Sequence, residues 1–450
     1  MISPARIAAF DILSAVSSGN ADLPTAIAFA RNTLRDDRDR ALAADIAAGV
    51  QRWRAELDHL IVSFAKRDIT RLDFEVVQIL RMTVYQILHL ARVPASAAVD
   101  DAVNLAKRAG KKSAAGFVNA VLRTIARNRN HLPLPPRPGS RSDRKAAVDY
   151  LSVSLSHPRW LAERWLDRFG FDTTEAWMQF NNSPAPLTLR ANTLKITPST
   201  LAKTLDDEDV RVHEGRFAPA ALIVDEGYPL RGAGLDQGLF VVQDEASQLV
   251  AVLANPQPGT RVLDACASPG GKTTAMAGAM GGDGTIVACD LRDRRIQLLR
   301  KTVGASGARV LIVQANLLRP LPFSRGFDLV VVDAPCSGLG TLRRDPDIRW
   351  RRREEELTPL AASELTMLQR AAESVAPGGR LVYATCSSEP EENEGVVDAF
   401  LASSSDFLPL HARAAAPQLP GDVVDDRGHL RTEPHRHGLE AFFGAVFRRQ

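Results

Sequence analysis

Apolar positions recur at helical spacing through the first part of the chain, residues 1–127. Between residues 76 and 88 they follow one another at three- and four-residue steps, which is one face of a helix. Further helices are expected over 98–109, where Gly110 can end the helix, and over 117–126. The pattern predicts an all-helical domain.

From Gly259 onward the pattern changes to short apolar runs that alternate with helical segments. A helix is expected over 357–375, with Pro377-Gly378-Gly379 as the turn after it. Strands are expected over 261–265, 285–289, 310–314, 327–332, 380–384 and 442–447. Strands that alternate with helices predict an α/β fold, a parallel sheet with helices on both faces.

The segment between these two patterns predicts two further parts. Residues 128–145 are rich in proline and arginine and are typical of a linker. Residues 146–255 are expected to form a small α+β subdomain, and the α/β domain then spans 256–450.

One strand of the small subdomain has a polar side. In the run over 186–192, Arg190 and Asn192 lie on the same side of the predicted strand. That side could contact a nucleic-acid backbone or be a salt-bridged surface strand. Asp244 is a plausible N-cap of the helix that leads into the α/β domain.

Charge is distributed unevenly along the chain. The net charge is +3, but residues 1–145 carry a balance of +9, with a cluster formed by Lys107, Arg108, Lys111 and Lys112. A basic front end favours a polyanionic partner such as nucleic acid. The alternatives are a solvated surface and, for the cluster, interaction with the negative end of a helix dipole.

Several classes of protein are not supported. No signal peptide and no apolar run of about 18 residues is visible, so a membrane partner is not expected. The four cysteines, at positions 266, 289, 336 and 386, have no metal-ligand spacing and no small disulfide framework. We expect a cytoplasmic, monomeric protein with reduced thiols and no metal.

Two of these cysteines follow apolar strands of the α/β domain. Cys336 comes after the strand over 327–332, and Cys386 comes after the strand over 380–384. Sheets of this class bind their ligands at the carboxyl ends of the strands. Two thiols at one sheet edge indicate covalent chemistry, and position alone does not decide which thiol attacks.

A glycine-rich turn follows the first strand of this domain. Gly270 and Gly271 lie just before a predicted helix, and Asp290 follows the next strand, 20 residues after Gly270. A loop, a strand and an acid in this order are typical of nucleotide binding, where the acid holds ribose hydroxyls. A phosphate-binding loop ending in Gly-Lys-Thr would need glycine at position 266, where this chain has cysteine.

Motifs in the helical domain carry a first resemblance. The segment Val93–Val103 and the segment Phe117–Leu122 are similar to the NusB-type RNA-binding helical domain, with a match over roughly residues 4–127. This resemblance implies an RNA partner for the basic front end.

Three motifs in the α/β domain carry a second resemblance. They are Asp264–Thr273, Asp333–Thr341 with Arg343–Trp350, and Tyr383–Ser387 with Glu391–Glu394. In this order they resemble the RsmB/Nop/Sun family of RNA (cytosine-5)-methyltransferases, and with the NusB-like front end the whole chain resembles the RsmB type, which acts on small-subunit (16S) rRNA.

The resemblance implies a fold, a cofactor and catalytic roles. The fold is a class I (Rossmann-like) methyltransferase domain, and the cofactor is S-adenosyl-L-methionine. Cys386 is implied as the nucleophile that adds to cytosine carbon 6, with Cys336 assisting product release, and Asp333 and Lys272 also belong to the active site. The implied cofactor-binding residues are Cys266, Ala267, Ser268, Pro269, Gly270, Gly271, Lys272, Asp290, Asn316 and Asp333.

The chain departs from the family pattern at two cofactor-site positions. Ser268 stands where alanine is usual, and Asn316 stands where the third-strand motif usually ends in aspartate. An asparagine still hydrogen-bonds but carries no charge. Cys266 and Cys289 are expected to be buried fillers rather than reactive thiols.

Three other functions remain as alternatives. One is a tRNA cytosine-5 methyltransferase, because the family also contains tRNA-specific members. Another is a non-catalytic RNA-binding ribosome assembly factor, and the last is a small-molecule methyltransferase, which would not need a basic helical domain.

Overall fold

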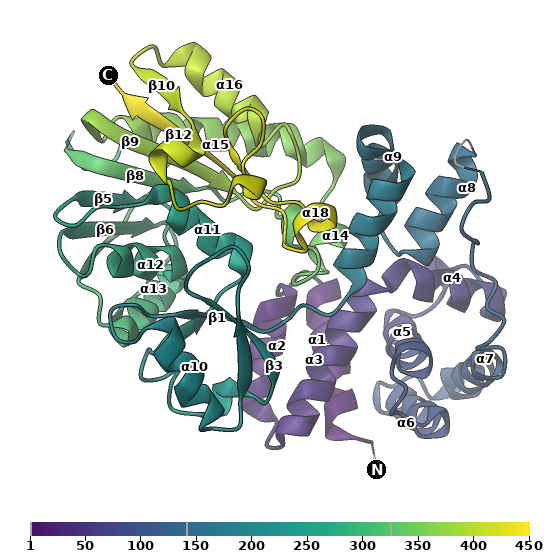
Figure 1. The fold of residues 1–450 in the computed structure, drawn as a ribbon. Coiled ribbons are helices and arrows are strands. Elements are labelled where there is room, and N and C mark those ends of the chain that lie inside the picture. The colour runs from purple at the N-terminus through teal and green to yellow at the C-terminus, as the bar shows by residue number, and fades with distance from the viewer. Residues whose placement is uncertain (1, 141–142, 325) are drawn as a thin grey trace. The chain divides into compact units, whose positions relative to one another are not determined.

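The computed structural model describes residues 2–140, 143–324 and 326–450 of the chain, and these form two compact units (Figure 1). Unit 1 consists of residues 1–183 together with 342–354, and unit 2 consists of 184–341 together with 355–450. Unit 1 is therefore built from two separate stretches of sequence. In the described residues, no helix is both long and apolar enough to cross a membrane.

Unit 1 is helical, as its sequence pattern predicts. Its first seven helices are α1 (Pro4–Ser17), α2 (Leu23–Thr33), α3 (Asp37–Arg52), α4 (Arg54–Ala65), α5 (Phe74–His89), α6 (Ala95–Arg108) and α7 (Ala115–Arg127). The three helices expected from the apolar spacing are α5, α6 and α7. Gly110 adopts a left-handed φ of +80° just after α6, which explains why that helix ends there.

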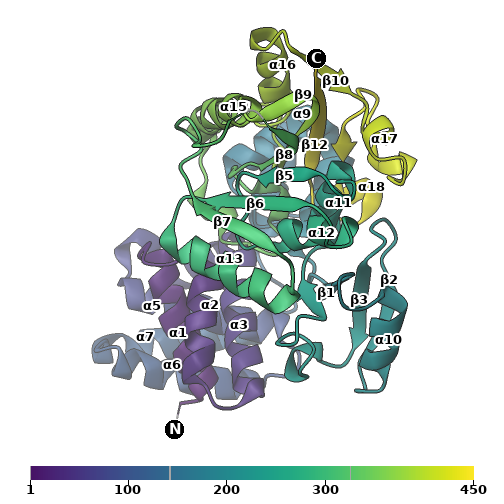
Figure 2. The same cartoon turned by 90° about the vertical axis from the view of Figure 1, so that its left-hand side faces the viewer.

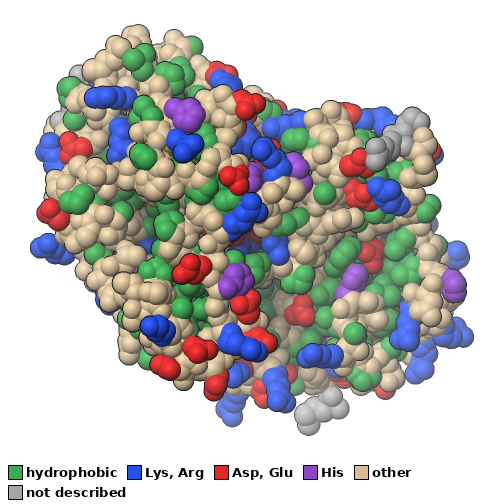
Figure 3. Space-filling view, viewed as in Figure 1, with side chains coloured by type: hydrophobic (Ala, Val, Ile, Leu, Met, Phe, Trp, Pro, Cys, Tyr) green, Lys and Arg blue, Asp and Glu red, His purple; other side chains and the backbone are tan. Residues whose placement is uncertain are grey.

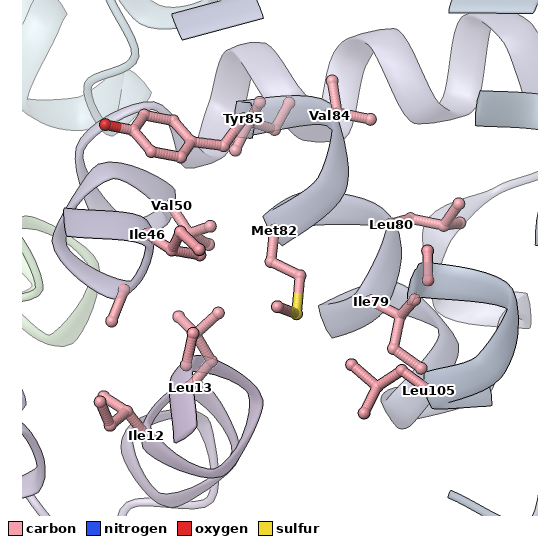
Figure 4. Packing of buried hydrophobic residues seen from close by; sticks show 14 of the residues in the cluster. Ile12, Leu13, Ile46, Val50, Ile79, Leu80, Met82, Val84, Tyr85 and Leu105 are labelled. Carbon is pink, nitrogen blue, oxygen red and sulfur yellow. The ribbon is translucent and has the colours of Figure 1, made fainter. Parts of the chain in front are cut away.

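One apolar core holds these helices together (Figure 4). Leu13 of α1, Ile46 of α3 and Met82 of α5 are buried side chains of this core, and Leu105 of α6 packs into the same cluster. Because α5 lies between neighbours on several sides, every residue from Val76 to Ile87 is buried.

The proline-rich segment after α7 does not behave as a free linker. Leu132 and Leu134 pack against the core of unit 1, and Arg137 forms an ion pair with Glu175 at 2.7 Å. Proline prevents a helix here, but the extended chain still contacts the helices beside it. The expected start of a new domain at residue 146 therefore lies inside unit 1.

Two more helices, α8 (Arg144–Asp149) and α9 (Arg159–Asn182), complete the continuous part of unit 1. Gly170 interrupts α9 with a φ of +74°. Trp165 and Trp177 are buried with ring centroids 5.1 Å apart, so these tryptophans belong to the core.

The second stretch of unit 1, residues 342–354, contains α14 (Ile348–Arg351). Arg349 is fully buried, and its guanidinium donates to the carbonyl oxygen of Ser156 and to Oδ1 of Asn182, both at 2.9 Å. The indole of Trp350 donates to the carbonyl oxygen of Gln51 at 2.6 Å. These contacts anchor the segment among the helices of unit 1.

Unit 2 begins with a small antiparallel sheet in the order β2-β3-β1-β4. Its elements are β1 (Thr188–Ala191), α10 (Pro198–Asp206), β2 (Arg211–Glu214), β3 (Ala221–Glu226) and β4 (Phe240–Val242). The expected strand over 186–192 is β1. Leu189 and Leu222 are among the buried side chains that pack this sheet against α10.

The large sheet of unit 2 has the strand order β10-β12-β9-β8-β5-β6-β7, with β11 paired to β12. Its strands are β5 (Arg261–Asp264), β6 (Thr285–Asp290), β7 (Val310–Gln314), β8 (Phe327–Asp333), β9 (Val375–Thr385), β10 (Phe407–Leu410), β11 (Leu430–Arg431) and β12 (Phe443–Arg449). Strands β5 to β9 are parallel where they pair, whereas β12 pairs antiparallel with β9 and β10. This is the predicted class I methyltransferase fold, with an antiparallel edge added to a parallel sheet.

Helices cover both faces of the large sheet (Figure 2). The helices are α11 (Glu245–Ala254), α12 (Gly271–Ala279), α13 (Asp293–Ser306), α15 (Leu357–Ala372), α16 (Glu394–Ser403) and α17 (Ala412–Ala415), and the short helix α18 (Pro434–His437) precedes β12. Val331 of β8 packs with α11 and α12, whereas its neighbours Val330 and Val332 pack with α15 and α16. This alternation places one apolar layer on each face.

The cap predicted for α11 is present, whereas the turn predicted before residue 380 lies inside a strand. Asp244 caps α11 as predicted, with its carboxylate accepting from the amide of Ala246. The turn expected at Pro377-Gly378-Gly379 lies within β9, which pairs with β8 from Val375 and shifts register before Arg380. Gly378 has a φ of +73°, so the predicted turn residues form an irregularity in a longer strand.

Candidate active site

The two thiols lie together at the carboxyl ends of β8 and β9. These neighbouring parallel strands pair Asp333 with Ala384, and the chain reaches Cys336 and Cys386 a few residues later. The two Sγ atoms are 3.3 Å apart. The shared edge expected from the strand pattern therefore becomes direct sulfur–sulfur contact.

The surroundings of Cys336 keep it protonated. Its hydrogen bond with Cys386, its burial, and the negative charges of Cys386 and Glu392 raise the pKa of the Cys336 thiol well above its usual value. Since the proton stays on Cys336, this thiol can donate to the sulfur of Cys386.

An ion pair lies beside the thiols. Lys272, the second residue of α12, donates from Nζ to Oδ2 of Asp333 at 2.6 Å. Burial lowers the pKa of Lys272, but the charge of Asp333, the hydrogen bond to it and the charge of Cys386 outweigh burial and raise the pKa overall. Lys272 therefore stays cationic, and its Nζ also lies 5.6 Å from the centroid of the Phe442 ring.

The glycine-rich loop connects β5 to α12. Gly270 has a φ of +103°, and a side chain there would meet Leu299 at 2.9 Å, so only glycine fits. Asp264 at the end of β5 is buried and accepts from Oγ1 of Thr273 at 2.6 Å. Burial raises the pKa of Asp264 to about 7, against the opposing effect of this hydrogen bond.

Asp290 ends β6 next to the glycine-rich loop. Its carboxylate accepts from the amide of Ser268 at 3.2 Å and from the amide of Leu291 at 2.8 Å, and it forms an ion pair with Arg295 at 3.2 Å. The amide of Arg292 also donates to it, at 3.5 Å, and together these contacts fix the orientation of the Asp290 carboxylate beside the loop.

The two departures from the family pattern have local roles. Ser268 donates from Oγ to the carbonyl oxygen of Arg295 at 3.0 Å, which ties the loop to α13. Asn316 follows β7, and its Oδ1 accepts from the amide of Leu318 at 3.0 Å in a tight turn. This hydrogen bond uses Oδ1 of Asn316, so the other polar group of the side chain is a donor, the Nδ2 amide.

These residues fit S-adenosyl-L-methionine. Gly270 lets the backbone approach a ligand closely, the N-terminus of α12 offers amide donors, and Asp290 offers an acceptor one strand away. The loop residues that the sequence predicted, from Cys266 to Gly271, all lie between β5 and the start of α12.

The other two cysteines are poor nucleophiles. Cys289 is buried in β6, and burial raises its pKa to about 12. Burial also raises the pKa of Cys266, together with the charges of Asp264 and Asp333. Both thiols remain protonated at neutral pH.

Sequence reasoning named no role for three residues that hold the cysteine loops. Asn393 is fully buried, accepts from Oγ1 of Thr385 at 2.6 Å and donates to the carbonyl oxygen of Ser387 at 3.0 Å, so it brackets Cys386 on both sides. Glu392 contacts both the loop that carries Cys336 and the loop that carries Cys386. Asn393 and Glu392 both lie in the Glu391–Glu394 motif, and this motif was the sequence signal that could have identified them.

The third residue is Gly340, whose backbone lies against the carbonyl oxygen of Cys386. The amide of Gly340 donates to that oxygen at 2.9 Å, and the carbonyl oxygen of Gly340 accepts from Ala441 at 3.0 Å. A Cβ on Gly340 would lie 2.7 Å from the carbonyl oxygen of Cys386 and would overlap that of Ala441. Close backbone approach explains the glycine.

The polar side of β1 is not a nucleic-acid surface. Arg190 is buried and donates to Gln243 at 2.8 Å and to Thr274 at 2.7 Å. Asn192 is buried and donates to the carbonyl oxygens of Gly238 and Ser306. Both side chains bind other parts of unit 2. This side of β1 is therefore neither a nucleic-acid surface nor a salt-bridged surface strand, and both predictions for it are wrong.

The basic cluster around the end of α6 is partly neutralised. Lys111 contacts Asp73 at 3.2 Å and Glu75 at 3.3 Å, whereas Lys107, Arg108 and Lys112 are exposed. Figure 3 shows lysine and arginine side chains gathered over the region of α6 and α7.

Comparisons with known proteins agree with this architecture. Residues 3–127 match the NusB family, residues 157–231 match a ferredoxin-like domain of RsmF/B-like methyltransferases, and residues 251–448 match the 16S rRNA methyltransferase RsmB/F family.

Full-length relatives match as well. The probable ribosomal RNA small subunit methyltransferase B of Bacillus subtilis is 32% identical over 92% of this chain and 91% of the relative. The ribosomal RNA small subunit methyltransferase B of Pseudomonas putida is 33% identical over 88% of each. The crystal structure of PH0851 covers 99% of both chains with a TM-score of 0.82 and 25% identity.

Fold, cofactor loop and relatives together define an S-adenosylmethionine-dependent RNA methyltransferase. More narrowly, the chain belongs to the RsmB/F family of 16S rRNA methyltransferases, with an N-terminal NusB domain.

Proposed function

We propose that this protein methylates carbon 5 of a cytosine in small-subunit (16S) rRNA through a covalent adduct between Cys386 and carbon 6. The observation that carries the proposal is the thiol pair, with its two sulfurs 3.3 Å apart. Relatives named as small subunit rRNA methyltransferases support the RNA class.

A thiol nucleophile suits this reaction because cytosine carbon 5 is a weak nucleophile. Addition of the Cys386 thiolate to carbon 6 turns carbon 5 into an enamine carbon that can attack a methyl group. The cofactor supplies that methyl group on a sulfonium. A base such as a water molecule then takes the proton from carbon 5. The electron pair of that C–H bond forms the 5,6 double bond as the bond from carbon 6 to the Cys386 sulfur breaks, which restores the aromatic ring.

Cys336 supports the second half of the cycle. Its thiol stays protonated and lies within hydrogen-bond distance of the Cys386 sulfur. As the carbon–sulfur bond breaks, this proton donor stabilises the departing thiolate. Cys336 therefore assists release of the methylated base, and Cys386 forms the bond.

The Lys272–Asp333 pair has a role at the base. Addition at carbon 6 pushes negative charge onto the N3 side of cytosine, where a hydrogen-bond donor lowers the barrier. Lys272 keeps its proton, and its ammonium group is held in place by a 2.6 Å hydrogen bond from Nζ to Oδ2 of Asp333. The target base must leave its stack to reach these groups.

The test is transfer of labelled methyl groups from cofactor to extracted 16S rRNA by wild type, Cys386→Ala and Cys336→Ala. We expect wild type to form 5-methylcytosine, Cys386→Ala to be inactive without an adduct, and Cys336→Ala to accumulate a protein–RNA adduct on a denaturing gel. An adduct formed by Cys386→Ala would overturn the assignment.

A parallel reaction with tRNA separates the substrate classes. We expect labelling of 16S rRNA and not of tRNA. The reverse result would make the protein a tRNA cytosine-5 methyltransferase, and labelling of neither RNA by an intact, cofactor-binding protein would favour the non-catalytic assembly factor.

A further inference from the structure

A fully buried carboxylate joins the two loops that carry the thiols. Oε1 of Glu392 accepts from the amide of Ser337 at 2.6 Å. Oε2 accepts from Oγ of Ser337 at 2.6 Å and from Oγ of Ser387 at 2.5 Å. Ser337 directly follows Cys336 and Ser387 directly follows Cys386, so one side chain bridges the residues next to both sulfurs.

The three donors satisfy both oxygens of the Glu392 side chain at this buried place. An ionised carboxylate that accepts two or three hydrogen bonds is stabilised against the cost of leaving water. The hydroxyl groups of Ser337 and Ser387 also lie 3.2 Å from each other, which makes the bridge compact. Such a network is rigid when every member has a partner.

A second buried acid supports Glu392 from the sheet side. The hydroxyl of Tyr383 donates toward Oε2 of Glu364 at 2.9 Å and lies 2.6 Å from the carbonyl oxygen of Glu392. Burial, followed by the charge of Glu392, raises the pKa of Glu364 to about 10. Glu364 is therefore neutral at pH 7.

We propose that Glu392 is a positioning residue that sets the separation and orientation of the Cys336 and Cys386 thiols by tying Ser337 to Ser387. The proposal rests on the cysteine chemistry proposed above and adds a determinant of its geometry. Glu392 acts on the sulfurs through the two serines that follow the cysteines in sequence.

Addition of the thiolate to the base and release of the methylated base depend unequally on the distance between the two thiols. Addition needs one sulfur at carbon 6, whereas release needs the second thiol to stay in contact with the first. Without the bridge, only the 3.2 Å contact between the hydroxyl groups of Ser337 and Ser387 joins the two loops at these serines. Release should then slow more than addition, so a variant without the carboxylate should resemble Cys336→Ala.

The kinetic test uses the full-length protein with Glu392→Ala and Glu392→Gln. Glu394→Gln is the matched control, because Glu394 lies two residues away and pairs with Arg431 instead of the serines. We expect Glu392→Ala to lower kcat about 100-fold, the usual effect of a misplacement near 1 Å, with the cofactor KM within about twofold and a visible RNA adduct. Glu392→Gln keeps one acceptor oxygen and should recover about tenfold.

A chemical test measures the thiol geometry without RNA. Diamide oxidises two neighbouring thiols to a disulfide, taking up two electrons and two protons as its azo group becomes a hydrazine. We expect wild type and Glu394→Gln to form the Cys336–Cys386 disulfide rapidly, as measured by mass spectrometry. Glu392→Ala should form it at least about tenfold more slowly.

The outcomes distinguish this proposal from the function on which it rests. If Glu392→Ala crosslinks and turns over as fast as wild type, the positioning role is wrong. If crosslinking depends on Glu392 but wild type forms no 5-methylcytosine and Cys336→Ala forms no adduct with RNA, the positioning role holds and the cytosine chemistry fails. If Glu392→Ala does not fold, as judged by thermal unfolding, Ser387→Ala provides the same comparison, and a wild-type crosslinking rate and turnover in that variant would equally overturn the proposal.

Discussion

Replacement of Gly340 by alanine tests the backbone packing around Cys386. The new Cβ would lie 2.7 Å from the carbonyl oxygen of Cys386 and would overlap the carbonyl oxygen of Ala441. Comfortable contacts between non-bonded carbon atoms lie near about 3.5 Å. Both neighbours are backbone atoms, so the loop must move by roughly 1 Å rather than a side chain turning aside.

The size of this effect follows from the crowding and from two hydrogen bonds. Overpacking costs about 1–3 kcal/mol, and the two backbone hydrogen bonds of Gly340, at 2.9 and 3.0 Å, contribute about 1 kcal/mol each. We expect Gly340→Ala to lose about 3–5 kcal/mol of unfolding free energy. For a domain of this size, that lowers Tm by roughly 5–15 °C.

Gly304→Ala is the matched control. Gly304 lies in α13, and among the described residues no atom outside its own helix turn comes within 4 Å of the place where its Cβ would be. Alanine is a better helix former by up to about 1 kcal/mol, so this variant should be as stable as wild type or slightly more stable.

Differential scanning calorimetry measures Tm, and methyl transfer to 16S rRNA measures turnover on the same samples. Because the displaced carbonyl belongs to Cys386, turnover by Gly340→Ala should fall by about 100-fold. A Tm within about 2 °C of wild type, with normal turnover, would refute the close-approach argument.

Three further predictions concern buried polar groups. Asn393→Ala should lose about 2–4 kcal/mol in urea unfolding, because it leaves the Thr385 hydroxyl and the Ser387 carbonyl without this partner; a loss below about 1 kcal/mol would contradict the bracketing role. The folded pKa of Asp264 is raised to about 7, so its contribution to stability is complete below its unfolded pKa near 3.8 and is lost as pH rises through 7. Asp264→Asn should therefore flatten the pH dependence of the urea midpoint between about pH 4 and 7. A pH dependence as steep as that of wild type would count against the raised pKa of Asp264. Glu364→Gln should leave the Tm at about pH 7 within about 2 °C of wild type, because Glu364 is already neutral there; a large drop would mean that the carboxyl is ionised.

The sheet and its reactive edge were predictable because they follow local rules. Val330, Val331 and Val332 form a continuous apolar run, which is typical of a strand buried on both faces. A cysteine a few residues past such a strand must lie at its carboxyl end, so the common edge of Cys336 and Cys386 followed from topology alone.

Burial of polar side chains was not predictable in the same way. Arg190 has the same sequence pattern whether it faces solvent or binds Thr274, which is 84 residues away. Glu392 lies in an acidic run that normally indicates a solvated surface, and its burial depends on Ser337, 55 residues earlier. Long-range partners of this kind come from the folded arrangement, and only the family resemblance drew attention to the Glu391–Glu394 motif.

The discontinuous composition of unit 1 has a consequence for synthesis on the ribosome. The continuous part of unit 1 ends at residue 183, but Arg349 and Trp350, which bind among its helices, belong to the stretch 342–354. The nascent helical unit is therefore incomplete until nearly four-fifths of the chain has been translated, after Cys336 has been made and before Cys386. A fragment that ends at residue 183 would leave Ser156 and Asn182 without the Arg349 guanidinium, so expression studies of unit 1 should supply the 342–354 segment.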